Sequence, residues 1–249
     1  MAKLKYVFNR YELKYLLTPE QYEIMLKGIE GKAKIDEYGE TTIQSLYYDT
    51  PDKLLIRRSI EKPEYKEKIR VRSYGLAKPD TKVFLELKKK SEKIVFKRRI
   101  ALLESEVERF FESGEFSSEG QIEEEIKYFR SFYKTLAPSM LLLYDRSAYH
   151  SPSEDIRITF DRNIRYRTDR LDLKAGLDGE LICDGGEVMM EIKTGTAYPM
   201  WLVRLLNDNK IYKRSFSKYG NAYKREFERA RQVKNETEKE TKSKCSTQY

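Results

Sequence analysis

The chain has 249 residues, of which 39% are hydrophobic and 36% are charged, and its formal net charge is +8. This length allows one large or two modest domains with a core, and the composition indicates a globular protein that is polar for its size. The sequence has neither an apolar stretch of about 20 residues nor an apolar leader, so we expect no membrane span and a cytoplasmic location. Only Cys183 and Cys245 are present, which excludes a disulfide framework and a cysteine-rich metal site.

The basic balance, with a pI near 9.1, indicates anionic partners. Composition alone leaves nucleic acid, anionic lipid, nucleotides and polyphosphate open. Proteins that bind nucleic acid usually gather basic residues on a helix or loop surface together with exposed aromatic residues. Here the best-patterned basic residues alternate along predicted strands, so we expect no nucleic-acid partner.

The chain begins with a predicted strand over 5–16 and a predicted helix over 18–29. The helix carries the marks of a defined start and a buried face: an N-cap residue, a proline at the first position, a capping-box glutamine and an apolar stripe. These residues are Thr18, Pro19, Gln21, Tyr22, Met25, Leu26 and Ile29.

The elements that follow predict an α+β protein. Further strands are expected at 45–50, 66–74, 82–90, 93–101, 140–150, 157–164, 181–184 and 188–194, and helices at 104–112, 121–136, 199–207 and 218–233. Residues 52–60 are expected to form a short helix or turn. Residues 234–249 form a polar segment that we expect to be a disordered tail, which leaves 1–233 as one domain. We predict an eight-stranded antiparallel β-barrel with a charged interior and flanking helices.

Charged or hydroxyl-bearing side chains occupy every second position in six stretches, with mostly apolar neighbours between them. Successive strand side chains point to opposite faces, so each stretch has a charged face and an apolar face. One such stretch is typical of a solvent-facing sheet edge, whereas six favour a charged interior that binds a polyanion such as phosphate. The stretches are Arg10-Glu12-Lys14, Lys66-Lys68-Arg70-Arg72, Glu86-Lys88-Lys90, Lys97-Arg99, Arg157-Thr159-Asp161 and Glu191-Lys193.

Three carboxylates among these stretches have two interpretations each. Glu191 is suited to holding Mg²⁺ or Mn²⁺ through hard oxygen atoms, and it is equally suited to a salt bridge with Lys193. Glu12 and Glu86 are the candidate general bases, or they balance the charge of the cationic lining. The sequence contains no Gly-x-x-x-x-Gly-Lys-Ser/Thr loop, so P-loop nucleotide binding is not expected.

Several short motifs, in a shared order and spacing over about residues 5–225, resemble the VTC domain. This is the polyphosphate polymerase module of the vacuolar transporter chaperone complex, within the triphosphate tunnel metalloenzyme superfamily. The motifs are Arg10-Tyr11-Glu12-Leu13-Lys14-Tyr15, Ser45-Leu46-Tyr47-Tyr48-Asp49-Thr50, Lys68-Ile69-Arg70-Val71-Arg72, Leu85-Glu86-Leu87-Lys88, Tyr144-Asp145-Arg146, Arg157-Ile158-Thr159-Phe160-Asp161, Met190-Glu191-Ile192-Lys193 and Ser215-Phe216-Ser217-Lys218-Tyr219.

The resemblance implies a tunnel through an eight-stranded barrel that holds a triphosphate or polyphosphate chain. Carried over to this sequence, it implies catalytic roles for Lys14, Arg70, Arg72, Lys88, Arg146, Arg157 and Lys218. It implies substrate binding by Lys97, Tyr144, Arg10 and Lys193, and a divalent metal, Mn²⁺ or Mg²⁺, held by Glu191 with Glu12 and Glu86 as further candidates.

One departure from the superfamily bears on the reaction. Many of its hydrolases open with Glu-x-Glu-x-Lys, whereas this chain has Arg10-x-Glu12-x-Lys14, which fits the polymerase branch better. We therefore expect a polymerase that transfers the γ-phosphate of ATP to a polyphosphate chain. The alternatives are an inorganic tripolyphosphatase or nucleoside triphosphatase, and a non-catalytic sensor of polyphosphate or inositol phosphates. A membrane partner is left open.

Overall fold

The computed structural model describes residues 11–61, 63–92 and 94–246, with side chains up to residue 232. The strands are β1 (Tyr11–Leu17), β2 (Lys34–Asp49), β3 (Tyr65–Tyr74), β4 (Lys82–Ser91), β5 (Ile94–Leu103), β6 (Ala137–His150), β7 (Ile156–Arg167), β8 (Glu180–Leu181) and β9 (Val188–Thr194). The helices are α1 (Pro19–Ile29), α2 (Leu54–Glu61), α3 (Val107–Ser113), α4 (Gln121–Tyr133), α5 (Met200–Asp208) and α6 (Lys218–Ser246), with a 3₁₀ turn, η1, at Glu104–Glu106.

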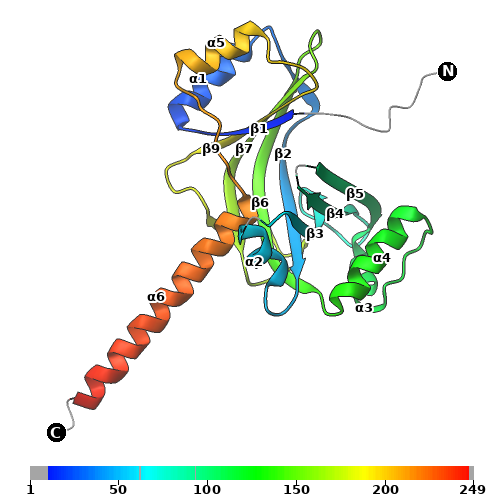
Figure 1. Cartoon of the computed structure of the whole chain (residues 1–249), viewed down its shortest axis with the longest axis vertical. Helices are drawn as coiled ribbons and strands as arrows, with labels where there is room; N and C mark the ends of the chain where they lie inside the picture. The colour runs from blue at the N-terminus through cyan, green and yellow to red at the C-terminus, as the bar shows by residue number, and fades with distance from the viewer. Residues whose placement is uncertain (1–10, 62, 93, 247–249) are drawn as a thin grey trace.

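All nine strands belong to one antiparallel sheet. Eight of them follow the order β1-β9-β7-β6-β2-β3-β4-β5, and β8 pairs with β7 beside this path (Figure 1). The structure thus has the predicted α+β architecture, with a large antiparallel sheet and flanking helices. Between the two end strands, β1 and β5, no ladder is present among the residues that the structure describes.

One half of the sheet has its apolar face covered by α1 and α5 (Figure 1). The predicted α1 stripe lies against β7 and β9, where Met25 and Ile29 share a buried cluster with Ile158 and Ile192. Thr18 caps α1 as expected: its hydroxyl accepts a hydrogen bond from the Gln21 N–H, and the Gln21 side chain accepts one from the Thr18 N–H. The helix is therefore fixed at its start and along its buried face.

The other half of the sheet is covered by α3 and α4. The outward side chains of β3 and β4 are fully buried against Val107 and Phe110 of α3 and Ile126 and Phe129 of α4. Those strand residues are Ile69, Val71, Leu85 and Leu87. Because the helices remove this face from water, the opposite face of the same strands is left to carry the charged residues.

Strand β2 is much longer than the predicted 45–50. It begins at Lys34, and its pairing with β6 shifts in register between Ile35 and Glu40. Gly39 lies in this irregular stretch with a φ of 55°, a conformation that glycine adopts without strain. The bulge allows a polar, glycine-containing sequence that resembles a turn to continue as a strand.

Helix α6 also extends beyond its prediction, because it continues to Ser246. This differs from the disordered tail expected over 234–249, of which only 247–249 lie outside the described residues. The segment is rich in Lys and Glu, which have high helix propensity. The helix points away from the body of the protein (Figure 1). Among the described residues, no helix is both long and apolar enough to cross a membrane.

The packing of α4 predicts a large difference between two phenylalanines on the same helix. Phe129 is 1% exposed and Phe132 is 62% exposed. We expect Phe129→Ala to lower the free energy of unfolding by about 3–5 kcal/mol, because it removes buried area and leaves a cavity. Phe132→Ala is the control and should change it by less than about 0.5 kcal/mol. Urea denaturation followed by circular dichroism would measure both, and equal effects would contradict this packing.

Candidate functional site

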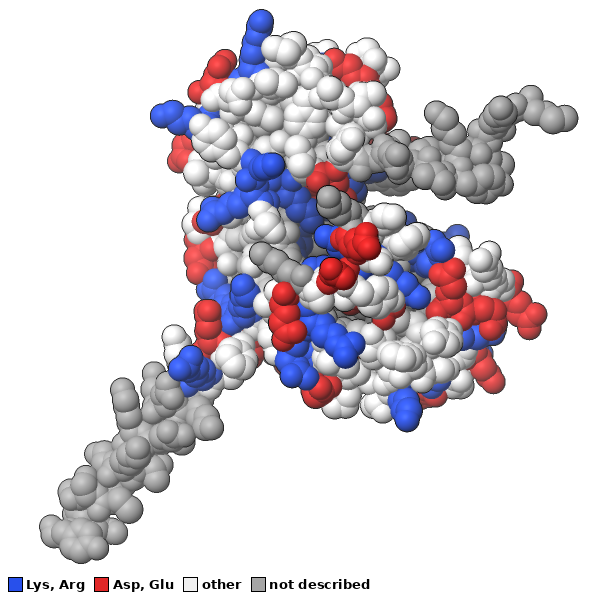
Figure 2. Space-filling model, viewed as in Figure 1, with Lys and Arg blue, Asp and Glu red and all other residues white. Residues whose placement is uncertain are grey.

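The charged face of the sheet brings together nearly all of the predicted site residues. We define it by the side chains at Glu12 and Lys14 of β1, Arg70 and Arg72 of β3, Glu86 and Lys88 of β4, Lys97 of β5, Tyr144 and Arg146 of β6, Asp161 of β7 and Glu191 and Lys193 of β9. Lysine and arginine side chains gather where the part containing α1 and α5 meets the part containing β3–β5, α3 and α4 (Figure 2). The ion pairs of the residues in this charged face divide them into three clusters, each around one or two carboxylates.

The first cluster surrounds Glu86, whose carboxylate is 3% exposed. Arg70 Nε donates to Glu86 Oε2 at 2.9 Å, Arg99 Nε donates to Oε1 at 2.7 Å, and Lys97 Nζ lies 3.0 Å from Oε1. Arg72 adds a fourth cation at 3.7 Å. Burial alone would raise the pKa of Glu86, but Arg70, Arg72 and Lys97 hold it well below its usual range. The carboxylate therefore stays ionised and fixes four cations from two strands, β3 and β5.

The second cluster surrounds Asp161, which is completely buried. Arg146 donates to both carboxylate oxygens, from Nε at 2.6 Å and from Nη2 at 2.8 Å, and Lys218 from the start of α6 donates to Oδ2. Burial favours the neutral acid, but Lys218 and Arg146 outweigh it and lower the pKa of Asp161 to about 2. Asp161 thus brings the first residue of α6 onto the charged face.

Tyr144 connects these two clusters. Its hydroxyl accepts a 3.5 Å hydrogen bond from Arg72, and its ring lies 4.4 Å from Lys218 Nζ and 5.2 Å from the Arg146 guanidinium. Burial raises the pKa of the Tyr144 phenol, and the charges of Arg72, Arg146 and Lys218 overcome this so that the net shift is downward. A phenol made more acidic in this way is a stronger hydrogen-bond donor to an anion.

The third cluster lies on β1 and β9. Lys193 Nζ is 2.8 Å from Glu191 and 3.7 Å from Glu12, and Lys14 Nζ is 3.9 Å from Glu191 and 3.5 Å from Glu12. Burial acts against ionisation, but Lys193 and Lys14 lower the pKa of Glu191 to about 2. Two carboxylates therefore share the same two lysines.

The two distant parts of the charged face lie opposite one another. Lys88 on β4 is solvent-exposed, yet desolvation lowers its pKa. The same pKa also responds to the charges of Glu12 and Lys14 on β1 and Glu191 on β9. Strands β1 and β4 are far apart in the sheet order, so the sheet must curve to bring these charges together. Lys88 therefore lies on the concave side of the curved sheet and is accessible to water there.

Two predicted residues differ from this arrangement. Arg157 is the second residue of β7 and its side chain is 56% exposed, paired with Asp36 of β2 at 3.2 Å. It therefore lies at the end of the charged face and takes part in none of the three clusters. Arg10 lies outside the described residues.

Three residues were missing from the predicted set. Asp161 organises the second cluster, Arg99 binds Glu86, and Lys68 lies on the same face of β3 as Arg70. All three occur in the alternating stretches, so their face was predictable from strand parity. Their partners were not, because these belong to strands or helices distant in the sequence.

The predicted metal ligands fit a divalent cation only in part. Glu191 and Glu12 share two lysines and supply the hard oxygen atoms that Mg²⁺ and Mn²⁺ prefer, with phosphate and water able to complete the shell. Glu86 has four cationic partners of its own. Within the described parts of the chain, no group of three or more acidic, histidine or cysteine side chains could hold a metal. Glu191 and Glu12 are therefore the residues that would hold one.

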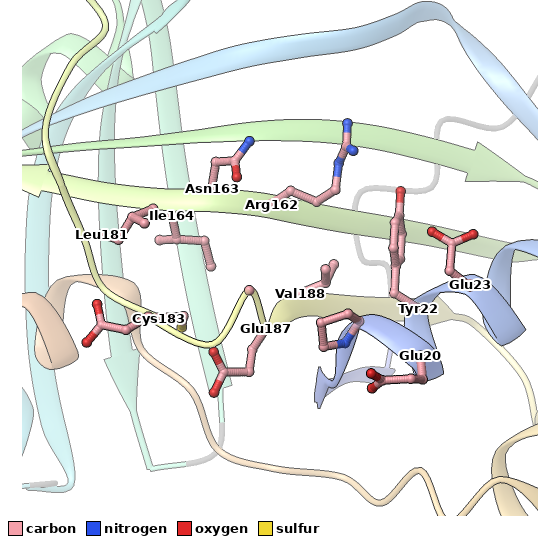
Figure 3. Close-up of a pocket in the computed structure, with 13 residues that line it drawn as sticks. Glu20, Tyr22, Glu23, Arg162, Asn163, Ile164, Leu181, Cys183, Glu187 and Val188 are labelled. Carbon is pink, nitrogen blue, oxygen red and sulfur yellow. The ribbon is translucent and has the colours of Figure 1, made fainter.

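A pocket of about 550 Å³ lies elsewhere, between α1, β7 and the segment 181–188 (Figure 3). Its lining includes Tyr22, Arg162, Cys183 and Glu187, and it contains none of the predicted site residues. Tyr22 and Arg162 contact each other at its side, where the guanidinium lies 5.8 Å from the ring centre. The charged face, not this pocket, is therefore the candidate functional site.

The protein thus has a curved antiparallel sheet with one apolar face covered by helices and one face lined by charged side chains. The matched family is the VTC domain, over residues 9–227, so the chain belongs to this family. A search of curated protein sequences gives no match.

Solved structures resemble the fold at low sequence identity. A candidate adenylate cyclase from Bacillus halodurans has a TM-score of 0.52 and 16% identity, with 83% of this chain and 92% of that chain covered. A candidate adenylyl cyclase from Hippeastrum, described as having a dominant triphosphatase activity, has a TM-score of 0.50 and 15% identity, with 85% and 93% covered. These structures share the overall fold of this chain, with its large antiparallel sheet and flanking helices.

The buried position of Asp161 generates a prediction about ligand rescue. Asp161→Asn leaves Arg146 and Lys218 without their carboxylate, so we expect it to lower the free energy of unfolding by about 3–5 kcal/mol. Tripolyphosphate should raise the melting temperature of this variant more than that of the wild type, because the anion replaces the lost charge. Differential scanning calorimetry with and without tripolyphosphate would measure both effects.

The control is Glu124→Gln, which removes an exposed carboxylate paired with Lys127 on α4. Its effect should be below about 1 kcal/mol, and its response to tripolyphosphate should equal that of the wild type. An Asp161→Asn variant as stable as this control would show that the second cluster is not structurally important.

Proposed function

We propose that the protein is a metal-dependent polyphosphate polymerase that transfers the γ-phosphate of ATP to a growing polyphosphate chain. In this proposal the sheet closes into a tunnel whose lining is the charged face. The observation that carries it is the convergence of cations from β1, β3, β4, β5, β6, β9 and α6 on one concave surface. So many cations side by side repel one another, and a polyanion is the ligand that relieves this repulsion.

The residues of the three clusters have distinct tasks in this reaction. Arg70, Arg72 and Arg146 grip phosphate oxygens, for which the planar guanidinium is well suited. Buried Glu86 and Asp161 hold these arginines in place before the substrate binds, so little reorganisation is needed. Tyr144 donates a hydrogen bond to a phosphate oxygen between the two clusters.

The metal belongs at Glu191 and Glu12. A divalent ion there would neutralise phosphate charge and polarise the phosphoryl group during transfer. Lys14 and Lys193 position the two carboxylates through their shared ion pairs. A terminal phosphate oxygen of the chain then bonds to the γ-phosphorus as the bond to the β-phosphate oxygen breaks and ADP leaves. The acceptor is already an anion, so no general base is required.

One observation favours hydrolysis of tripolyphosphate or nucleoside triphosphate as a second candidate. An apolar cluster that includes Tyr47, Leu142, Tyr166 and Tyr219 fills the same side of the sheet where α2 and α6 pack. The rings of Tyr47 and Tyr219 stack there at 4.1 Å. In a closed tunnel this cluster would narrow the way for a long chain, whereas a triphosphate would need only the charged clusters beside it. The description of the Hippeastrum neighbour as a triphosphatase is in line with this candidate.

The metal assignment predicts the behaviour of Glu191→Gln. The substitution keeps the shape of the side chain but removes one ligand charge, so we expect metal-dependent turnover to fall on the order of a hundredfold or more. Binding of tripolyphosphate without metal should stay within about threefold, because one carboxylate is lost while all cations remain. Glu108→Gln, an exposed change on α3, is the control. Full turnover by Glu191→Gln in Mn²⁺ would exclude Glu191 as a ligand.

The choice between polymerase and hydrolase predicts the products. Purified protein incubated with ATP and Mn²⁺ should release ADP and form chains longer than three phosphates, which gel electrophoresis would resolve. Short polyphosphate added at the start should shorten any lag, since it supplies an acceptor. Orthophosphate as the main product, even with added primer, would support the hydrolase. Binding without any turnover would support a sensor.

A further inference from the structure

Three lysines form a row across the charged face. Lys68 of β3 lies directly opposite Lys88 of β4, and Lys88 lies directly opposite Lys97 of β5. Like charges in direct cross-strand positions destabilise a sheet. Lys97 is compensated by Glu86, 3.0 Å away, but neither Lys68 nor Lys88 has an ion pair with any residue that the structure describes. Within the described parts of the chain, the row thus contains two cations that form no ion pair with a carboxylate.

Lys68 has the more enclosed position of the two. It lies next to the apolar cluster of α6, where its Nζ is 5.6 Å from the ring centre of Tyr219. That ring is fixed, because the Tyr219 hydroxyl donates to the buried carboxylate of Asp49, which also accepts the backbone N–H groups of Leu55 and Ile56. Lys68 is thus covered on one side by a ring that cannot easily move away.

The strongest charged influences on Lys68 are four cations. They are Lys66 and Arg70 of its own strand, Lys88 of β4 and Lys14 of β1, while α6 contributes the neutral Tyr219. The pKa of Lys68 is lowered to about 7. Burial of the side chain is the largest cause of this shift, and the four cations lower the pKa further. Without a bound anion, the ammonium form of this lysine is therefore disfavoured by its surroundings.

We propose that Lys68 is a phosphate-binding residue that takes up a proton when a polyphosphate or triphosphate anion enters the charged face. This inference rests on the proposed phosphate-binding function and concerns how that site responds to pH. The anion supplies a negative charge beside the four cations that act most strongly on Lys68. One proton moves from solvent to Nζ, and the resulting ammonium donates hydrogen bonds to phosphate oxygens.

The sign of the pH dependence follows from this step. A bound anion raises the pKa of Lys68. The contribution of Lys68 to the affinity is therefore complete at pH values below the pKa that Lys68 has in the unliganded protein, and it is lost as the pH rises above that pKa. With a free-state pKa of about 7, this contribution falls about tenfold between pH 6 and pH 8. The site therefore binds phosphate chains more tightly in mildly acidic solution.

Isothermal titration calorimetry with tripolyphosphate, in metal-free buffers of different ionisation enthalpy, would test the proposal at pH 7. The dependence of the heat on the buffer gives the number of protons taken up. The ligand contributes its own protons equally to every variant, so the comparison between variants isolates Lys68. We expect the wild type to take up about half a proton more than Lys68→Met or Lys68→Arg.

Lys68→Arg keeps the positive charge but cannot lose it near neutral pH, so it separates titration from charge. Between pH 6 and pH 8, the affinity of Lys68→Arg for tripolyphosphate should fall about tenfold less than the affinity of the wild type. Lys127→Met, which removes a partly exposed lysine from α4, is the control for net charge and should match the wild-type proton uptake. If Lys68→Met does not fold, the arginine variant decides the question.

The possible failures are distinguishable. Binding of tripolyphosphate with the same proton uptake in the wild type and Lys68→Arg would overturn the role of Lys68 and leave the phosphate-binding function intact. No binding of tripolyphosphate by the wild type would overturn the proposed function itself, and this inference with it.

Discussion

Charge balance around the buried carboxylate of Glu86 is the interaction on which the rest of the charged face depends. Four cations from β3 and β5 converge on this one group, and they keep it ionised although burial opposes ionisation. Without Glu86 the same side chains would repel one another and the concave surface would be unfavourable. Asp161 has the same role for Arg146 and Lys218 and also fixes the start of α6.

This arrangement is possible because the other face of the sheet supplies the hydrophobic core. Helices α1 and α5 cover β7 and β9, and α3 and α4 cover β3 and β4, so the strands are anchored by apolar packing and not by their charged side chains. Strong packing outside allows a charged interior that contributes little stability by itself. One face of the sheet therefore supplies the stability, and the other face is free to carry the charged side chains of the proposed binding site.

In the proposed function, the positions of the carboxylates would favour a phosphate chain over isolated anions. Glu86, Asp161 and Glu191 lie in separate clusters on different strands, each with its own cations, and Tyr144 joins two of these clusters. Successive phosphate groups of one ligand can contact successive clusters. The preformed ion pairs hold the cations in place, so binding requires little loss of side-chain entropy.

The alternation of residues along the strands determined by itself which side chains lie on the charged face and which on the apolar face, because strand side chains alternate strictly. It also identified the capped helix that begins at Pro19, since capping is local. Tertiary structure decided which cation meets which carboxylate, for example Lys218 with Asp161, because these partners are 57 positions apart. It alone decided that Gly39 continues a strand and that Lys68 lies under Tyr219. Those outcomes depend on contacts between distant segments, which no local pattern encodes.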